Sequence, residues 1–195
     1  TLTRPVGDLR MGIFTNSERW KVLIPEADIS FDTMDYLHQQ FDDSTGDIIV
    51  NACLVPNREV SDAILNLKMN EELVCEHGWL ARRGTGDIIV RYHEESVIVL
   101  EKRWHLYQWN DKVLRQDFDI ISNGRTSVQL SSTNTVIGDP SQVFMEEGAS
   151  VEACVLNTTT GPIYIGKNAE IMEGCLVRGP LAMCEHSVLK MGAKI

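Results

Sequence analysis

The stretch IGDPSQVFMEEGASVEACVLNTTTGPIYIGKNAEIMEGCLVRGPLAMCEHSVLKMGAKI, residues 137–195, carries an apolar residue at every sixth position, with one four-residue insertion around Thr160-Gly161-Pro162. Four positions after most of these apolar residues comes a small residue, with Glu147 and Leu181 as exceptions. This spacing is the hexapeptide pattern of a parallel β-helix. The apolar positions are Ile137, Val143, Ala149, Val155, Ile165, Ile171, Val177, Met183, Leu189 and Ile195.

Each six-residue unit supplies one short strand and one turn, and three units close one triangular coil. The apolar side chain points into the coil, and the small residue fits where the chain bends. A single coil cannot bury its apolar residues, so each coil depends on its neighbours for a continuous core. We therefore predict a parallel β-helix over residues 131–195.

The repeat continues to the last residue. Ile195 occupies an inward position of a new unit, without a polar terminal coil or a capping helix. A solenoid needs a polar cap, because an open last coil presents unpaired backbone groups and apolar surface. The sequence also opens at Thr1 rather than at Met. We expect the chain to be a piece of a longer protein, with a truncated β-helix, and we expect the full-length protein, but not this chain alone, to be an active transferase.

Composition limits the classes of partner. With 18 basic and 28 acidic residues the net charge is −10, and the basic residues are scattered along the chain. We expect no binding to duplex nucleic acid or to an anionic membrane, because both need a positive protein surface. No run approaches the roughly 20 apolar residues of a membrane span. The five cysteines form no CxxC pair, which favours buried thiols in a reducing cytoplasm.

The first two-thirds of the chain alternates helix and strand patterns. Thr15-Asn16-Ser17-Glu18 fits a capping box that begins one helix, and Pro56-Asn57 precedes a helix with one apolar face. Alternation of this kind predicts an α/β layered domain. The other expected elements are a helix over 32–41, strands over 47–54, 88–92 and 97–100, and a hairpin over 73–81.

A connector joins the two parts. Residues 104–109 are rich in aromatic side chains, residues 111–122 fit a helix, and Asn123-Gly124 fits its stop. A polar stretch, Ser131-Ser132-Thr133-Asn134, then precedes the repeat. We place the domain boundary near residue 130, which gives domains over 1–130 and 131–195.

Four stretches resemble a known family over nearly the whole chain. The family comprises sugar nucleotidyltransferase-like proteins similar to the bifunctional N-acetylglucosamine-1-phosphate uridyltransferase and glucosamine-1-phosphate acetyltransferase that makes UDP-N-acetylglucosamine. The stretches are TRPVGDLRMGI at 3–13, IIVNA at 48–52, SSTNTVIGDPS at 131–141 and NTTTGPIYIG at 157–166.

The resemblance implies a Rossmann-like nucleotidyltransferase domain, here incomplete at its N-terminus, followed by a left-handed β-helix that assembles a homotrimer. It implies transfer of a nucleotidyl group from a nucleoside triphosphate to a sugar 1-phosphate, with Mg²⁺, in nucleotide-sugar and cell-envelope polysaccharide metabolism. Such chemistry holds the α-phosphate for in-line attack while cations spread the developing charge.

The resemblance also suggests binding residues. Similar enzymes place a Gly-rich, Arg-bearing loop before a Lys-Pro or Arg-Pro step, and Arg4-Pro5 matches that step although the preceding strand and loop are absent. Arg4 and Arg10 are the candidate phosphate ligands. Asn51-Ala52 stands where a Mg²⁺-binding Gly-Asp pair would fall, so Asn51 is a third candidate and the amide is a poor metal ligand. Asp8 and Asp47 are substitutes away from the matching position; no catalytic group or metal ligand is assigned.

Two other functions stay open. In similar β-helix enzymes acetyl-CoA lies between subunits of a trimer and a histidine acts as general base, for which His186 is the available residue of the repeat. Alternatively, the missing Gly-Asp and Gly-rich elements mark a catalytically inactive scaffold that assembles trimers.

The remaining conspicuous residues favour ordinary structural roles. The pairs Glu94-Glu95 and Glu146-Glu147 are typical of solvated charge in loops and turns. Trp104, Tyr107 and Trp109 can stack on a sugar or a base, but packing of the connector is the favoured interpretation. Three histidines lack a nucleophile partner or fit the edge of a core: His38, His77 and His105.

Overall fold

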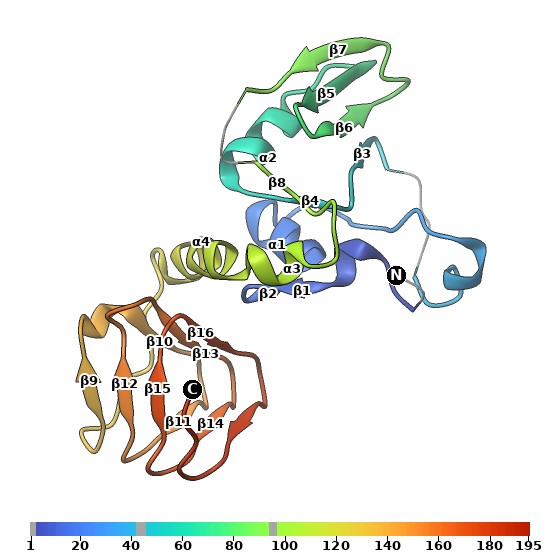
Figure 1. Cartoon of the computed structure of the whole chain (residues 1–195). Coiled ribbons are helices and arrows are strands. Elements are labelled where there is room, and N and C mark those ends of the chain that lie inside the picture. The colour runs from blue at the N-terminus through green and yellow to red at the C-terminus, as the bar shows by residue number, and fades with distance from the viewer. Residues whose placement is uncertain (1–2, 42–45, 94–96) are drawn as a thin grey trace. The chain divides into compact units, whose positions relative to one another are not determined.

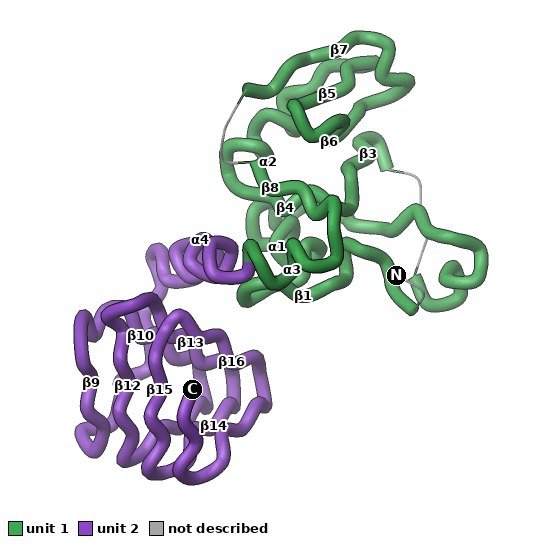
Figure 2. Tube along the Cα trace, viewed as in Figure 1, with its two compact units in different colours: residues 1–109 green, residues 110–195 purple. Residues whose placement is uncertain are grey.

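The computed structural model describes residues 3–41, 46–93 and 97–195 (Figure 1). The chain divides into two compact units, residues 1–109 and residues 110–195 (Figure 2). The division precedes the connector helix, which therefore groups with the C-terminal unit. The predicted domain boundary near residue 130 stays a prediction.

The first unit opens with a 3₁₀ turn, η1 (Val6–Asp8), a short hairpin of β1 (Arg10–Met11) and β2 (Phe14–Thr15), and helix α1 (Asn16–Leu23). The predicted capping box is confirmed. The Thr15 hydroxyl accepts a hydrogen bond from the Glu18 N–H, and the Glu18 carboxylate accepts one from the Thr15 N–H. These two bonds satisfy donors that the first turn of a helix leaves unpaired.

A mixed sheet follows, in the order β3-β6-β5-β7. Strands β6 and β5 form the predicted hairpin, β3 pairs antiparallel with β6, and β7 pairs parallel with β5. Strands β4 and β8 pair separately. The elements are β3 (Ile48–Val50), β4 (Leu54–Val55), α2 (Arg58–Leu65), β5 (Glu71–Cys75), β6 (Gly78–Arg83), β7 (Ile88–Arg91) and β8 (Ile98–Val99).

One face of this sheet packs against α2. Leu73 and Ala81 are registered partners in the sheet and share a core with Val60 and Ile64 of the helix. The helix begins as predicted, because the Asn57 side chain accepts the Val60 N–H. The α/β class is thus confirmed. The described residues form a small mixed sheet, however, and not the parallel sheet with alternating helices of a Rossmann-like domain.

The helix predicted over 32–41 is wrong. Only the 3₁₀ turn η2 (Asp35–Leu37) forms within the described part of that range. Leu37 is buried, whereas Met34 and Tyr36 are exposed, so the apolar residues provide no continuous buried face. Short helices in proteins depend on such a face for most of their stability.

The connector helix is confirmed. Helix α3 (His105–Gln108) ends the first unit, and α4 (Asn110–Ser122) begins the second. Within the second unit the Arg115 side chain donates to the Thr160 carbonyl and pairs with Asp111. Among the described residues, no helix combines the length and the apolar character needed to cross a bilayer.

Nine short strands of the second unit form three parallel sheets, β9-β12-β15, β10-β13-β16 and β11-β14-β17. The chain visits the three sheets in rotation, so each strand pairs with the strand three places later (Figure 1). The strands are β9 (Thr135–Ile137), β10 (Val143–Met145), β11 (Ser150–Val151), β12 (Val155–Asn157), β13 (Ile163–Ile165), β14 (Glu170–Ile171), β15 (Leu176–Arg178), β16 (Leu181–Met183) and β17 (Val188–Leu189).

The inward positions of the later strands are as predicted, since Ile165, Ile171, Val177 and Met183 are all buried. Four earlier assignments are wrong. Val136 and Leu156, not Ile137 and Val155, are in register with Val177. Val151, not Ala149, is in register with Ile171, and Met145, not Val143, is in register with Ile165. Leu156 is fully buried, whereas Ile137 is 45% exposed.

The inward positions shift because the corners between strands differ in length. Nine residues separate Val136 from Met145, with the 3₁₀ turn η3 (Pro140–Gln142) between them, but only six separate Val177 from Met183. A strict six-residue count therefore drifts in the first coil. Gly148 shows what such corners demand: its φ is +77°, and a Cβ there would lie 2.1 Å from Asn168 Oδ1.

Candidate functional site

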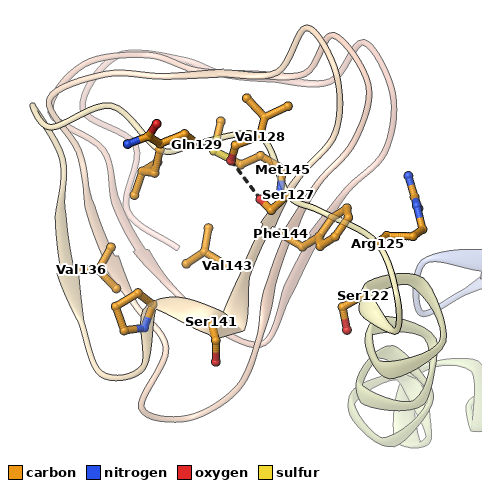
Figure 3. A pocket seen from close by; sticks show the side chains of 12 residues that line it. Ser122, Arg125, Ser127, Val128, Gln129, Val136, Ser141, Val143, Phe144 and Met145 are labelled. Carbon is orange, nitrogen blue, oxygen red and sulfur yellow. Dashed lines mark hydrogen bonds between the residues drawn. The ribbon is translucent and has the colours of Figure 1, made fainter.

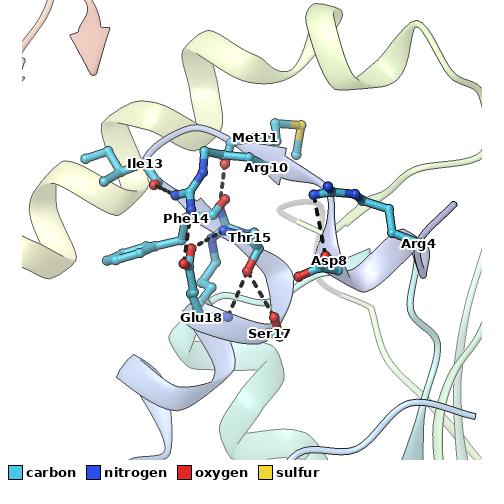
Figure 4. A network of polar contacts seen from close by, with 10 residues as sticks. Arg4, Asp8, Arg10, Met11, Ile13, Phe14, Thr15, Ser17 and Glu18 are labelled. Carbon is cyan, nitrogen blue, oxygen red and sulfur yellow. Dashed lines mark hydrogen bonds and ion pairs between the residues drawn. The ribbon is translucent and has the colours of Figure 1, made fainter. Parts of the chain in front are cut away.

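The candidate residues Arg4 and Arg10 lie on the segment that leads into α1 (Figure 4). Arg4 pairs with Asp8, Nη1 to Oδ2 at 3.6 Å, across the 3₁₀ turn η1. The Arg4 side chain is 55% exposed. An exposed pair of this kind contributes little to stability, so an anionic ligand can replace the carboxylate at small cost.

Arg10 stands on β1 opposite Thr15. Its Nη2 donates to Glu18 Oε1 at 3.0 Å, and its Nη1 donates to the Ile13 carbonyl (Figure 4). Glu18 thus serves both the capping box and Arg10, which ties the position of the guanidinium to the start of the helix. Arg4 and Arg10 are held by different carboxylates, and each side chain remains partly exposed.

Asn51 closes the turn after β3. Its Nδ2 donates to the Trp79 carbonyl at 3.0 Å, and its Oδ1 accepts the Cys53 N–H at 3.0 Å. Both ends of the amide therefore have backbone partners, which is the arrangement of a strand-end turn. A role for Asn51 in binding stays a prediction. Burial raises the pKa of the neighbouring Cys53 thiol, which keeps it protonated and weakly nucleophilic.

The structure brings the N-terminal segment and the Asn51 turn together. Asn16, at the start of α1, donates from Nδ2 to the carbonyls of Leu54 at 2.9 Å and Ala52 at 3.3 Å. A Cβ built on Gly7 would lie 3.9 Å from the Ala52 Cβ, so η1 also approaches this turn. We call residues 4–19 and 51–54 the arginine site.

The described residues do not fit a protein-built Mg²⁺ site. Among them there is no group of three His, Cys, Asp or Glu side chains placed to hold a metal ion. Asp8 is paired with Arg4, and the Asn51 amide is engaged in its turn. Mg²⁺ is commonly held by one or two carboxylates together with substrate phosphates, so the predicted Mg²⁺ stays a prediction.

His186, the candidate base of the acyltransferase reading, lies at an exposed corner with φ of +58°. Its backbone N–H donates to the Lys167 carbonyl, which fixes the corner. The predicted outward exposure is confirmed, and a catalytic role stays a prediction.

Glu146 forms a network on the outside of the second unit rather than a catalytic pair with Glu147. Arg125 donates to both of its carboxylate oxygens, at 2.6 and 3.0 Å, and the Tyr164 hydroxyl donates at 3.2 Å. Burial, and then the Glu146 charge, raise the pKa of Tyr164 above its ordinary value. The pair Glu94-Glu95 lies outside the described residues.

Two aromatic residues of the connector are not packed as predicted. Trp104 is 63% exposed and Tyr107 is 89% exposed, so these two rings do not pack into a core. His38 is also exposed, and its Nε2 contacts the Thr33 carbonyl. His77 lies between the carboxylates of Glu76 and Glu101.

Sequence reasoning missed one cavity, of about 540 Å³, in the first coil of the second unit. Figure 3 shows Val136 and Val143 projecting into it, with Ser127 and Arg125 toward one side. Ser127 Oγ accepts the Met145 N–H at 2.9 Å and helps the 125–130 segment cross the coil. The lining mixes apolar side chains with serines, Gln129 and Arg125, and it offers no titratable pair for catalysis.

Comparison with known proteins gives the class. The family model of sugar nucleotidyl transferases matches residues 1–126, which include the whole arginine site. The chain belongs to the sugar nucleotidyl transferase family. No curated protein matches the chain.

Proposed function

We propose that this chain supplies part of a transferase that moves a nucleotidyl group from a nucleoside triphosphate to a sugar 1-phosphate. The family match over residues 1–126 carries this proposal. The arginine site supports it, because two partly exposed guanidiniums lie on one short segment beside a strand-end turn. Guanidinium groups are well suited to phosphate oxygens because they present several N–H donors in a fixed plane.

In the proposed reaction an oxygen of the sugar 1-phosphate attacks the α-phosphorus, the bond to the β-phosphate bridge breaks, and pyrophosphate leaves. Arg4 and Arg10 would exchange Asp8 and Glu18 for phosphate oxygens and spread the charge that develops during attack. Mg²⁺ stays a prediction from the reaction class, and no step proposed for these residues passes through it.

For the second unit, we propose a left-handed β-helix that assembles homotrimers. The three parallel sheets visited in rotation, with Val136, Leu156 and Val177 in register, support a parallel β-helix. Its left hand and the homotrimer follow from the family resemblance. The same architecture, with the exposed His186, is the basis of the alternative acyltransferase reading with acetyl-CoA.

The inactive-scaffold reading is favoured by one observation. Asn51, at the position expected for a metal-binding carboxylate, uses its side chain for a backbone turn. Under that reading the family fold is retained while nucleotide binding is lost.

Thermal unfolding with UTP, dTTP or a sugar 1-phosphate, each with Mg²⁺, separates these readings. A ligand at about 100 times its dissociation constant adds roughly 2.7 kcal/mol of stability. We expect a nucleoside triphosphate to raise Tm, and pyrophosphate to form with a sugar 1-phosphate in the full transferase of which this chain supplies part. No shift with any nucleotide at millimolar concentration would contradict the transferase, and a shift with acetyl-CoA alone would favour the acyltransferase.

A further inference from the structure

Arg19 is the largest of the fully buried side chains, with 1% of its surface exposed. Burying a guanidinium is costly unless its N–H groups find acceptors. Nη1 donates to Asn16 Oδ1 at 2.6 Å, and Nη2 donates to the carbonyls of Met11 at 2.7 Å and Phe14 at 3.4 Å. These hydrogen bonds link the Arg19 side chain to the start of α1 and to the β1–β2 hairpin.

Met11 and Phe14 are the registered pair that closes the β1–β2 hairpin. Arg19 therefore reaches from α1 to both strands of the hairpin that carries Arg10. The planar guanidinium of Arg19 is important here, because its two terminal nitrogens donate to acceptors that lie in different directions. A lysine ammonium on a flexible side chain cannot reproduce this geometry.

Asn16 extends the connection. It is 3% exposed, its Oδ1 accepts from Arg19, and its Nδ2 donates to the carbonyls of Ala52 and Leu54. The Leu54 N–H in turn donates to the Asn51 carbonyl at 2.9 Å. A continuous buried relay thus runs from the Arg10 hairpin through Arg19 and Asn16 to the Asn51 turn.

We propose that Arg19 is a positioning residue that holds the Arg10 hairpin against the Asn51 turn in the geometry that receives a nucleotide phosphate. This rests on the proposed function of the arginine site. Arg19 itself contacts no ligand, because it is buried behind the hairpin and acts through the backbone that carries Arg10 and through Asn16.

The test compares Arg19→Lys and Asn16→Ala with Asn57→Ala, which removes the cap of α2 and leaves the relay intact. UTP affinity of each variant is measured by calorimetry at the same interval below its own Tm. We expect Arg19→Lys to weaken UTP binding about tenfold, which lies within the range found for residues that influence a binding site without touching the ligand. Asn57→Ala should leave affinity unchanged. Equal affinities for Arg19→Lys and the unaltered chain, or an equal loss in Asn57→Ala, would overturn the proposal.

Amide hydrogen exchange without ligand separates this inference from the proposed function. A role confined to local packing speeds exchange in the hairpin and α1 only. The relay predicts faster exchange at Cys53 and Leu54 as well, in Arg19→Lys and in Asn16→Ala, and the second variant decides the matter if the first does not fold. Unchanged exchange at Cys53 and Leu54 would overturn the relay. Absence of UTP binding in the unaltered chain, with exchange altered as expected, would overturn only the function.

Discussion

The two units use different means to hold their chain segments together. In the second unit the stabilising pattern is repeated: parallel strands stack aliphatic side chains in columns, such as the partly buried Val136 and the buried Leu156 and Val177. In the arginine site single polar side chains, above all Arg19 and Asn16, join segments that are far apart in sequence. A repeated apolar column is suited to a scaffold, whereas a specific polar relay can hold cationic groups in one geometry.

The largest effect should come from the apolar column. Leu156→Ala should cost about 2–5 kcal/mol, because it leaves a cavity between Val136 and Val177. Val155→Ala, one residue away and half-buried, is the matched control and should cost much less. Hydrogen exchange of the β12 and β15 amides reports the local loss. An equal loss of stability in the two variants would contradict the observed orientation, in which Leu156 and not Val155 points into the core.

A single polar contact should have a smaller effect. Thr15→Ala removes half of the capping box of α1 and should cost about 1 kcal/mol. Thermal unfolding followed by circular dichroism measures this loss, with the exposed Lys21→Ala as a control inside the same helix. A loss as large as that of Leu156→Ala would mean that the polar region is as tightly coupled as the apolar column.

The Glu146 network should respond to alkaline pH. Because the folded protein raises the pKa of Tyr164, the unfolded chain loses this proton first, and the stabilisation is present below about pH 10 and declines as pH rises further. At neutral pH Tyr164→Phe should cost about 0.5–1.5 kcal/mol for its hydrogen bond to Glu146. Urea unfolding between pH 8 and pH 11 should show a shallower decline in the variant. An identical pH dependence would contradict the buried environment of Tyr164.

The smallest effect is expected at the exposed rings. Trp104→Ala and Tyr107→Ala should each change stability by less than about 0.5 kcal/mol, since neither ring is buried. Phe118→Ala, in the buried face of α4, is the contrasting variant and should lose much more stability. Differential scanning calorimetry makes the comparison. A substantial loss at Trp104 would support the packing role that its exposure argues against.

Local signals in the sequence predicted well the elements that depend on local chemistry. The capping box, the Asn57 cap and the 73–81 hairpin each depend on residues a few positions apart. The six-residue period predicted the parallel strands, but it misplaced four residues because corner lengths vary without changing the apolar composition: Ile137, Val143, Ala149 and Val155.

Long-range features were beyond the sequence pattern. The helix expected over 32–41 failed because only Leu37 is buried in the fold. Arg4 and Arg10 were found through a family resemblance, whereas Arg19 has no local signal: its importance follows from burial and from acceptors that only the folded chain brings together. The buried N-terminal position of Asn16 was visible only as part of a capping box.

The most direct test of the arginine site is UTP binding to the unaltered chain and to Arg10→Ala, measured by calorimetry in the presence of Mg²⁺, with Arg58→Ala on α2 as a charge-matched control. We predict binding by the unaltered chain and by Arg58→Ala, with a loss of about tenfold or more in Arg10→Ala. Equal affinity in all three proteins, or no binding by the unaltered chain, would contradict the assignment of residues 4–19 and 51–54 as the phosphate-binding part of this sugar nucleotidyl transferase family member.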